Sequence, residues 1–224
     1  MFDRVISFVG KDNLEKFMNT TVLIVGVGGV GGYAMEALVR TGIGNIILVD
    51  YDKVDASNLN RQIITEQKNI GKVKVEVAKE RINSINPDCN VIIHNTFLDG
   101  NTINRLDNYK IDYIVDACDS VQAKKLLIDY SIDKDIKLIA SMGTAKKIDP
   151  TKLEIMDIRK TSYDPLAKIL RKYVMDKKTN KKVMVVSTTE EPIESDVLAS
   201  LMFVPATAGI LCANYIIKDI IKQD

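Results

Sequence analysis

Residues 23–32 constrain the fold of this chain more than any other stretch, because a short apolar run there leads directly into closely spaced glycines. The apolar residues are β-branched and too few for a buried helix, so they predict a buried strand. Gly26, Gly28 and Gly31 then form the pattern G-x-G-x-x-G, in which glycines permit a tight turn and let the backbone approach a phosphate group. The stretch predicts a phosphate-binding turn at the start of a helix. A glycine turn with only a packing role is the alternative.

The chain that follows strengthens the phosphate-binding interpretation. Residues 30–38 place apolar side chains on one helical face, and Thr41 and Gly42 end that helix. A second apolar run, residues 46–49, predicts the next strand and leads to Asp50. In folds of this kind an acidic residue at that place binds the ribose of a nucleotide. We therefore expect a nucleotide site with Asp50 on the ribose.

Composition excludes several other kinds of site. The 224 residues include 31 Lys and Arg against 30 Asp and Glu, so no global field attracts nucleic acid and any such binding needs a local patch. The single histidine, His94, excludes a hydrolytic triad and a multi-histidine metal centre. The three cysteines, Cys89, Cys118 and Cys212, lie far apart in the chain, which disfavours a structural zinc site, and each is expected to be a small buried residue.

Predicted strands alternate with predicted helices through the first part of the chain, after two short helices at its start. The strands are residues 23–25, 46–49, 90–94, 113–115 and 136–140, and the helices begin at the glycine turn, near Gly71 and at Val121. This alternation predicts an α/β fold, a Rossmann-like doubly wound and mostly parallel sheet with helices on both faces. Because ligands of such sheets bind at the carboxyl ends of the strands, the glycines, Asp50 and Asp119 are expected in one crevice.

Beyond Ser141 the pattern changes to a C-terminal extension of mixed strands and helices. The extension is expected to contain strands at residues 153–156, 183–186 and 201–204, a helix starting at Asp164 and Pro165, and a buried helix from Pro205 or Ala206 to Ile221. No charge occurs from Val197 to Ile217, but proline, glycine and polar residues interrupt this span, so we expect a buried helix and no membrane span. Its apolar faces offer a dimer contact.

A basic run lies inside the extension, with Tyr173 in its middle. Its members are Lys168, Arg171, Lys172, Lys177, Lys178, Lys181 and Lys182. One interpretation is a solvated helix face and loop. The other is a contact with a polyanion, in which each neutralised phosphate adds salt-dependent affinity.

Five segments, in this order and spacing, resemble the adenylating domain of the ubiquitin-activating E1-like (ThiF/MoeB/HesA) enzyme superfamily. They are residues 26–31, 50–52, 58–62, 71–76 and 116–120. Within that superfamily, residues 41–44, 148–150, 160–167 and 203–209 are similar to the tRNA threonylcarbamoyladenosine dehydratases. The resemblance implies one ATP-binding adenylation domain over residues 1–224, with its core at 20–145 and the extension at 146–224.

The resemblance also implies a reaction: ATP adenylates the carboxylate of the threonylcarbamoyl group at position 37 of tRNA, and AMP leaves as the ring closes. By matching positions, Arg61 and Lys72 would hold the phosphates, Asp119 would carry Mg²⁺, and Arg4 is similar to an arginine that dimer mates supply in trans. The implied nucleotide contacts are Gly26, Gly28, Gly29, Gly31, Asp50, Asp52, Asn58, Arg61, Gln62 and Lys72. Surface ion pairs for Arg61 and Lys72, and a helix N-cap for Asp119, are the alternatives.

Chemistry supports these roles independently of the resemblance. Attack of a carboxylate on an α-phosphate builds charge on the phosphoryl oxygens, which positioned cations and a metal stabilise. Magnesium prefers hard oxygen ligands, commonly a carboxylate together with substrate phosphates. Asp119 meets that requirement.

Other functions stay open at this point. An E1-like enzyme that activates the C-terminal carboxylate of a small sulfur-carrier protein usually has paired zinc cysteines and a cysteine in the crossover loop, whereas residues 141–196 contain no cysteine. An NAD-binding oxidoreductase is disfavoured by the two cations Arg61 and Lys72, and a nucleotide-gated scaffold without catalysis is a further alternative. The stretch 182–207 is shorter than in many of the tRNA enzymes.

The resemblance adds partners, and the start of the sequence indicates a location. It implies a homodimer, a tRNA carrying threonylcarbamoyladenosine as substrate and, for some relatives, a cysteine desulfurase or sulfur acceptor. The start of the sequence has no signal peptide, since its apolar stretch is short and charges interrupt it, so a cytoplasmic protein is expected.

Overall fold

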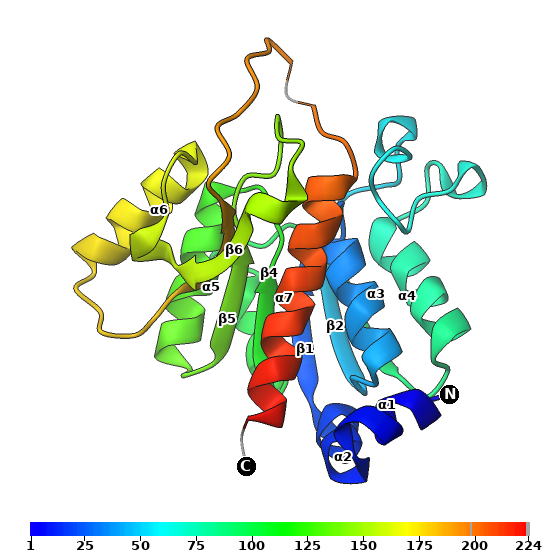
Figure 1. The fold of residues 1–224 in the computed structure, drawn as a ribbon. Helices are drawn as coiled ribbons and strands as arrows, with labels where there is room; N and C mark the ends of the chain where they lie inside the picture. The colour runs from blue at the N-terminus through cyan, green and yellow to red at the C-terminus, as the bar shows by residue number, and fades with distance from the viewer. Residues whose placement is uncertain (198, 223–224) are drawn as a thin grey trace.

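The structure is a computed structural model that describes residues 1–197 and 199–222, and it shows one sheet with helices on both faces (Figure 1). The α-helices are α1 (Asp3–Val9), α2 (Lys11–Asn19), α3 (Gly31–Thr41), α4 (Lys74–Ile85), α5 (Val121–Asp133), α6 (Pro165–Asp176) and α7 (Phe203–Ile221). The strands are β1 (Thr21–Val25), β2 (Asn45–Asp50), β3 (Asn90–Asn95), β4 (Tyr113–Asp116), β5 (Lys137–Ser141), β6 (Leu153–Asp157) and β7 (Met184–Thr188). Short 3₁₀ helices are η1 (Ala56–Asn58), η2 (Gln67–Asn69), η3 (Ile103–Asn108), η4 (Pro150–Lys152) and η5 (Ile158–Lys160).

The strand order confirms the doubly wound sheet. The strands lie in the order β3-β2-β1-β4-β5-β7-β6, and every neighbouring pair is parallel except β6 and β7. The chain moves outward from β1 to β3 on one side and from β4 on the other. The carboxyl ends of β1 and β4 therefore mark the point where the winding reverses, which is where open α/β sheets bind ligands.

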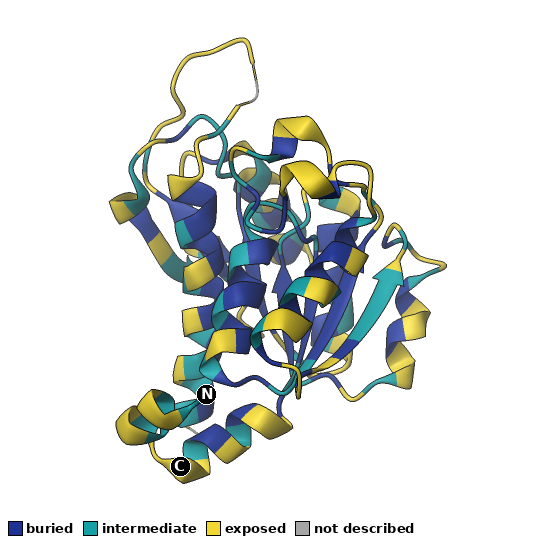
Figure 2. Cartoon of the chain, turned by 90° about the vertical axis from the view of Figure 1, so that its right-hand side faces the viewer, coloured by how far each residue is buried: buried dark blue, intermediate teal, exposed yellow. Residues whose placement is uncertain are grey.

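Alternating residues of the central strands supply two separate cores. On β1, Val22 and Ile24 pack with α3, α4 and α7, whereas Leu23 and Val25 pack with α5 and α6. Because side chains of a strand point alternately to its two faces, a strand buried on both faces becomes an unbroken apolar run. This explains why residues 22–25 are uniformly apolar, and it fixes the strand that leads into the glycine turn. Figure 2 shows the interior of the sheet in the dark blue of buried residues.

The extension joins the same sheet rather than forming a separate layer. Strand β7 pairs in parallel with β5, and β6 adds at the edge in the antiparallel direction, with Leu153 opposite Thr188. Asp164 caps α6 by accepting from the Ala167 N–H, and Pro165 occupies the first turn, as the sequence predicted.

Two boundary predictions are wrong. Residues 201 and 202 are not a strand; α7 instead begins at Phe203, with Pro205 in its first turn, where a missing N–H leaves no helical bond unmade. A short apolar run before a helix cannot be assigned to strand or helix by periodicity alone. The helix expected near Gly71 begins at Lys74, because Gly71, Lys72 and Val73 form a turn whose backbone bonds to the loop at Val54.

Helix α7 is long and apolar enough to cross a membrane by length and composition, and 50% of its apolar window is buried inside the molecule. It lies along α3 in Figure 1, where Gly209 permits the close approach: a Cβ there would overlap the carbonyl oxygen of Val30. Such a helix is also typical of the core of a soluble α/β fold, in agreement with the expectation of no membrane span.

An extended segment projects above the carboxyl edge of the sheet (Figures 1 and 2). It comprises residues 189–197 and 199–202, and we call it the strap. Lys146 ties both arms of the strap to the loop after β5: its N–H donates to the Ala199 carbonyl, its carbonyl accepts from Ile193, and its ammonium donates to the Ser195 carbonyl.

Candidate functional site

An open cavity of about 280 Å³ lies at the carboxyl ends of β1, β2 and β4. Its lining brings together most of the residues that the sequence singled out. These are Gly26, Gly28, Gly29, Asp50, Asp52, Asn58, Arg61, Gln62 and Asp119. The expectation that the glycines, Asp50 and Asp119 lie in one crevice is therefore confirmed for Gly26, Gly28, Asp50 and Asp119.

The glycine turn needs glycine at two positions for different reasons. Gly26 has a φ of +87° and its backbone lies against Ala117, where a Cβ would come within 2.7 Å of the carbonyl oxygen. Gly31 starts α3, and a Cβ there would overlap the Gly26 carbonyl oxygen. Gly28 and Gly29 line the cavity instead, so their bare backbone faces the space in which a ligand would lie.

Asp50 holds the turn from the neighbouring strand. It is buried, and its Oδ2 accepts from the Val27 N–H at 2.7 Å while Oδ1 accepts from the Asp52 N–H at 2.9 Å. Each carboxylate oxygen has further lone pairs, so Asp50 can still accept from a ribose hydroxyl. Its position at the end of β2 is the one that the sequence predicted.

The loop after β2 folds into η1 and places three polar side chains on the cavity. Asn58 closes a capping box with Asp55, whose backbone N–H it accepts at 3.3 Å. Arg61 is half-buried and donates to the Ser57 carbonyl at 2.8 Å, which aims its guanidinium along the loop. Gln62 is buried, and its Oε1 has no hydrogen-bond partner among the described residues.

The buried cation of the cavity is Lys74, which the sequence analysis missed. Lys74 lines the cavity with a side chain only 6% exposed, and its Nζ lies 2.9 Å from Asp52 Oδ2. Lys72 is exposed and does not line the cavity, so the structure does not place it with the other predicted phosphate ligands. The reason is the later start of α4, which projects the second lysine of Gly71-Lys72-Val73-Lys74 inward.

Asp119 lies in the exposed turn between β4 and α5 and lines the cavity. The alternative role as helix N-cap is wrong, because Ser120 caps α5 by accepting from the Ala123 N–H. Within residues 1–197 and 199–222, no hydrogen bond or ion pair engages the Asp119 carboxylate, and no group of three acidic, histidine or cysteine residues is placed to hold a metal. A single free carboxylate is the donor set by which magnesium is held together with substrate phosphates.

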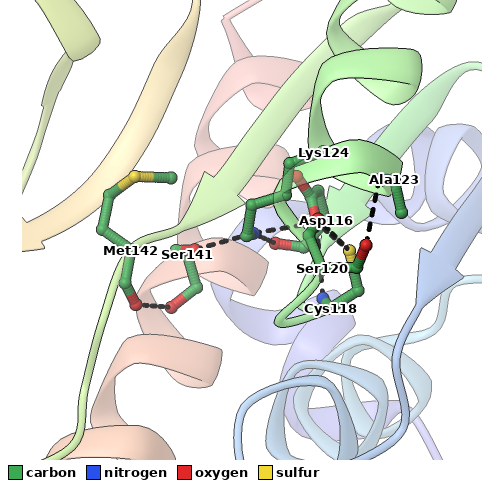
Figure 3. A network of polar contacts seen from close by, with 7 residues as sticks. All are labelled: Asp116, Cys118, Ser120, Ala123, Lys124, Ser141 and Met142. Atoms are coloured by element: carbon green, nitrogen blue, oxygen red, sulfur yellow. Dashed lines mark hydrogen bonds and ion pairs between the residues drawn. The ribbon is translucent and has the colours of Figure 1, made fainter. Parts of the chain in front are cut away.

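A closed polar network supports the turn that carries Asp119 (Figure 3). Lys124 and Asp116 are fully buried, and Lys124 Nζ donates to Asp116 Oδ1 and to the Ser141 carbonyl, both at 2.9 Å. Burial lowers the pKa of Lys124, whereas the charge of the Asp116 carboxylate and its hydrogen bond raise it together with smaller contributions, and on balance the pKa lies above its usual value. Cys118 also donates to Asp116 Oδ1, at 3.1 Å. The network fastens the ends of β4 and β5 to α5.

The far end of the cavity is aromatic. Tyr51 and Phe97 line it with their rings edge to face, 5.2 Å between centroids, beside Thr96 and Leu98. The sequence analysis did not single out the residues after β3, although their place at the carboxyl end of a parallel strand was a usable signal. An apolar wall with aromatic edges suits a nucleobase.

A second cavity of about 520 Å³ adjoins the first and shares Val30, Ala117, Cys118, Asp119 and Thr144 with it. Its wall is largely apolar and is completed by the loop after β5, the start of α6 and Pro192 of the strap. A buried ion pair joins two of these parts: Lys147 Nζ lies 3.3 Å from Asp164 Oδ2 and donates to the Gly143 carbonyl at 2.8 Å. Asp119 therefore stands where the two cavities meet.

Arg4, like Lys72, is a predicted site residue that does not line the cavity. It is exposed on α1, which together with α2 packs below the amino ends of the strands, at the opposite end of the sheet from the cavity (Figure 1). Within one copy of the chain, Arg4 cannot contact a ligand in the cavity.

The three cysteines are poor nucleophiles. Burial raises the pKa of Cys89 to about 11 and that of Cys212 to about 12. Burial and the adjacent Asp116 carboxylate raise the pKa of Cys118 as well. The expectation of buried apolar roles is confirmed for Cys89 and Cys212, whereas Cys118 is half-buried and lines both cavities.

Comparison with known proteins gives concordant matches. The sequence profile of the ThiF family matches residues 2–224. The tRNA threonylcarbamoyladenosine dehydratase of Bacillus subtilis (strain 168) is 38% identical over 241 residues, which covers 99% of this chain and 95% of that protein. The enzyme of the same name from Escherichia coli (strain K12) is 42% identical over 162 residues, covering 72% of this chain and 60% of that protein.

Solved structures agree with the sequence matches. The Escherichia coli tRNA N6-threonylcarbamoyladenosine dehydratase in complex with ATP superimposes with a TM-score of 0.92 at 35% identity, covering 98% of this chain and 93% of that one. The same enzyme in complex with AMP gives a TM-score of 0.91 at 36% identity, covering 97% and 92%. These neighbours share the fold over nearly the whole chain.

Proposed function

Since the chain belongs to the ThiF family, we propose that it performs the reaction of its relatives and is an ATP-dependent tRNA threonylcarbamoyladenosine dehydratase. The observation that carries this conclusion is the convergence of the glycine turn, Arg61, Lys74 and Asp119 on one cavity. Relatives of this name bind ATP and AMP. The substrate is a tRNA whose threonylcarbamoyl group carries a free carboxylate.

Different residues of the cavity contact the base, the ribose and the phosphates of the nucleotide. The base lies against Tyr51 and Phe97, Asp50 accepts from the ribose, and the glycine turn presents backbone N–H groups to the phosphates at the start of α3. Arg61 and Lys74 bring positive charge to the triphosphate. Lys74 takes the role predicted for Lys72, because Lys74 is the lysine whose side chain lines the cavity.

The chemical step is attack by the substrate carboxylate on the α-phosphorus, which releases pyrophosphate and forms a mixed anhydride with AMP. Ring closure onto the activated carbonyl then breaks the acyl–oxygen bond and releases AMP. Negative charge builds on the phosphoryl oxygens during the first displacement, so fixed cations lower its barrier. The second cavity meets the first at Asp119, and its apolar wall suits the acyl-bearing nucleoside.

Asp119 fits a magnesium ion, because its carboxylate is exposed to the cavity and engaged by no other described side chain. Bound there, Mg²⁺ would neutralise charge on the departing pyrophosphate. The cavity lining has two further carboxylates. Asp50 is bonded to backbone N–H groups, and Asp52 is paired with Lys74.

The function is tested by incubating the protein with ATP and tRNA carrying threonylcarbamoyladenosine, followed by digestion to nucleosides and mass spectrometry. The proposal expects one water lost from the modified nucleoside, with one AMP and one pyrophosphate released per event. Release of AMP and pyrophosphate that requires a carrier protein ending in Gly-Gly, and not tRNA, would establish the E1-like carrier activation instead. Tight binding of NAD with none of ATP would establish the oxidoreductase.

Arg4 requires a second copy of the chain if it acts at the cavity, so the proposal includes a homodimer. Exposed Phe203 and Ile210 on the outer side of α7 offer apolar surface for such a contact. Mixing inactive Arg4→Ala and Asp119→Asn proteins tests the exchange. Shared sites would restore about a quarter of wild-type activity, since half of the dimers are mixed and each mixed dimer has one intact site. No restoration would contradict action in trans.

The remaining expectations concern location and a sulfur partner. Relatives modify tRNA, which favours the cytoplasm. Transfer of sulfur through this chain's own cysteines is disfavoured, because all three thiols have raised pKa values. A cysteine desulfurase or sulfur acceptor would therefore act as a binding partner and not through a thiolate of this chain.

A further inference from the structure

Positive charge is concentrated in one segment of a nearly neutral chain. The whole sequence has a formal net charge of +1, yet residues 159–182 contain nine Lys and Arg against two Asp. The rest of the chain is therefore net negative. Positive charge clustered on one segment in this way is typical of a surface that binds an extended polyanion.

The nine cations of this segment fall into two groups. Four are engaged: Arg159 with Asp157, Arg171 with the Thr161 carbonyl, Lys177 with Asp129, and Lys181 with Asp135. The other five are exposed, and no hydrogen bond or ion pair in the described part of the chain engages their side chains; they are Lys160, Lys168, Lys172, Lys178 and Lys182. The first group fixes the shape of the segment and leaves the second group free to bind.

Helix α6 orders the free cations. Ala167, Leu170 and Val174 face the core, so Lys168 and Lys172, one turn apart, form a ridge on the solvent side. Helix α6, which carries this ridge, lies at the edge of the molecule, away from α7 and α3 (Figure 1).

The same helix begins at the wall of the second cavity. Asp164 and Pro165 line that cavity, which adjoins the nucleotide cavity at Asp119. Tyr163, the residue before them, is 60% exposed and has a φ of +57°, a conformation that a tyrosine rarely adopts. A ligand held along α6 would thus end beside the place where the acyl group reacts.

We propose that the solvent face of α6 with its flanking turns, carrying Lys160, Lys168, Lys172, Lys178 and Lys182, binds the phosphate backbone of the substrate tRNA, and that Tyr163 stacks on one of its bases. The inference rests on the proposed tRNA substrate. Lysines act as point charges that neutralise phosphates, and exposed aromatic rings stack on bases of any identity. The tRNA chemistry therefore accounts for both the charge and the aromatic residue.

The test compares two triple variants in tRNA binding. Lys168→Gln/Lys172→Gln/Lys182→Gln removes three cations of the ridge and its flank. Lys11→Gln/Lys110→Gln/Lys222→Gln removes three exposed lysines elsewhere, near the amino ends of the strands, and is the matched control. The dissociation constant of each protein for tRNA carrying threonylcarbamoyladenosine is measured over a series of KCl concentrations, together with the affinity for ATP.

The α6 variant is expected to bind tRNA at least about tenfold more weakly at physiological salt, with the slope of log K against log[KCl] reduced by about 2 to 3. The control is expected to match the wild type, and all three proteins are expected to bind ATP equally. Tyr163→Ala is expected to weaken binding without changing the salt slope. If the α6 variant binds tRNA with the affinity and the salt slope of the wild type, the inference is overturned. This holds also if the same variant loses binding to an acidic protein, which would then be the partner of this surface.

The outcome is separable from the proposed function. Binding requires no turnover, so a tRNA that binds along α6 and is never dehydrated would contradict the proposed activity and leave the surface assigned. If the α6 variant dehydrates tRNA with an unchanged KM for tRNA, the proposed activity stands and the assignment of the tRNA-binding surface is contradicted.

Discussion

Two of the Lys–Asp pairs at the carboxyl edge of the sheet have the same N–O distance but differ in what surrounds them. Lys124 and Asp116 are both 0% exposed and hold three parts of the chain together. Lys74 is 6% exposed and its partner Asp52 is 46% exposed, at the wall of the nucleotide cavity. The N–O distance is 2.9 Å in both. We call the first the closed pair and the second the open pair.

The difference shows how the same residue types serve structure in one place and ligand binding in the other. In the closed pair every partner is within the protein, so removing one leaves a buried charge uncompensated. In the open pair water already reaches the carboxylate, so the lysine is free to exchange its partner for a phosphate. The N–O distance is the same in both pairs, so the two roles differ because the aspartate is buried in the closed pair and exposed in the open pair.

The largest effect is expected from Lys124→Met, which leaves Asp116 buried without its cation. The free energy of unfolding should fall by about 3–5 kcal/mol. Denaturant titration measures it, with Lys124→Met/Asp116→Leu as the control that removes both charges and should recover much of the loss. A drop smaller than about 1 kcal/mol would show that the closed pair is not structural.

The matching substitution in the open pair, Lys74→Met, should leave the fold intact and abolish most activity. Loss of one positioned charge at the phosphates should lower kcat by about 10²–10³-fold. The free energy of unfolding should change by no more than about 1 kcal/mol, because Asp52 stays solvated. Steady-state dehydration of modified tRNA measures kcat, and Lys72→Met is the control expected to keep near wild-type activity. Equal losses in the two variants would contradict the assignment of Lys74.

A smaller effect is expected in the pH dependence of the unfolding free energy, to which the closed pair contributes. The pKa of Lys124 lies above its usual 10.5, because burial lowers it but the Asp116 carboxylate, its hydrogen bond and smaller contributions together raise it by more. A raised pKa in the folded state stabilises the protein fully below the unfolded value, and this contribution is lost as the pH rises through the folded value. The gap in unfolding free energy between wild type and Lys124→Met should stay constant below about pH 10 and narrow above 10.5. A gap that closes between about pH 7 and 9 would mean that Lys124 is neutral.

Sequence patterns predicted what depends on backbone geometry and strand order. The glycine turn, Asp50 at the end of β2 and Asp119 after β4 follow from where parallel strands end, and all lie on the cavity. The sequence placed Lys72 in the crevice, whereas Lys74 lines the cavity, because a turn bonded to Val54 makes α4 begin at Lys74 and not near Gly71. The closed pair was missed altogether: Lys124 occupies an ordinary helical position, and only the tertiary fold shows it buried.

The basic run illustrates the same limit at the surface. Its seven residues look alike in sequence, whereas the structure pairs Lys177 and Lys181 with aspartates and turns Lys168 and Lys172 to solvent. Likewise, residues 201–204 carry an apolar run that suits either a strand or a helix, and packing of α7 against α3 decided between them.

The central claim is that this cavity joins the substrate carboxylate to AMP. The most direct measurement uses tRNA whose threonylcarbamoyl carboxylate is labelled with oxygen-18, followed by mass spectrometry of the released AMP. Each AMP is expected to carry one labelled oxygen, since the carboxylate oxygen that attacks the phosphorus leaves with it at ring closure. Unlabelled AMP, with the label recovered in water or in pyrophosphate, would contradict it.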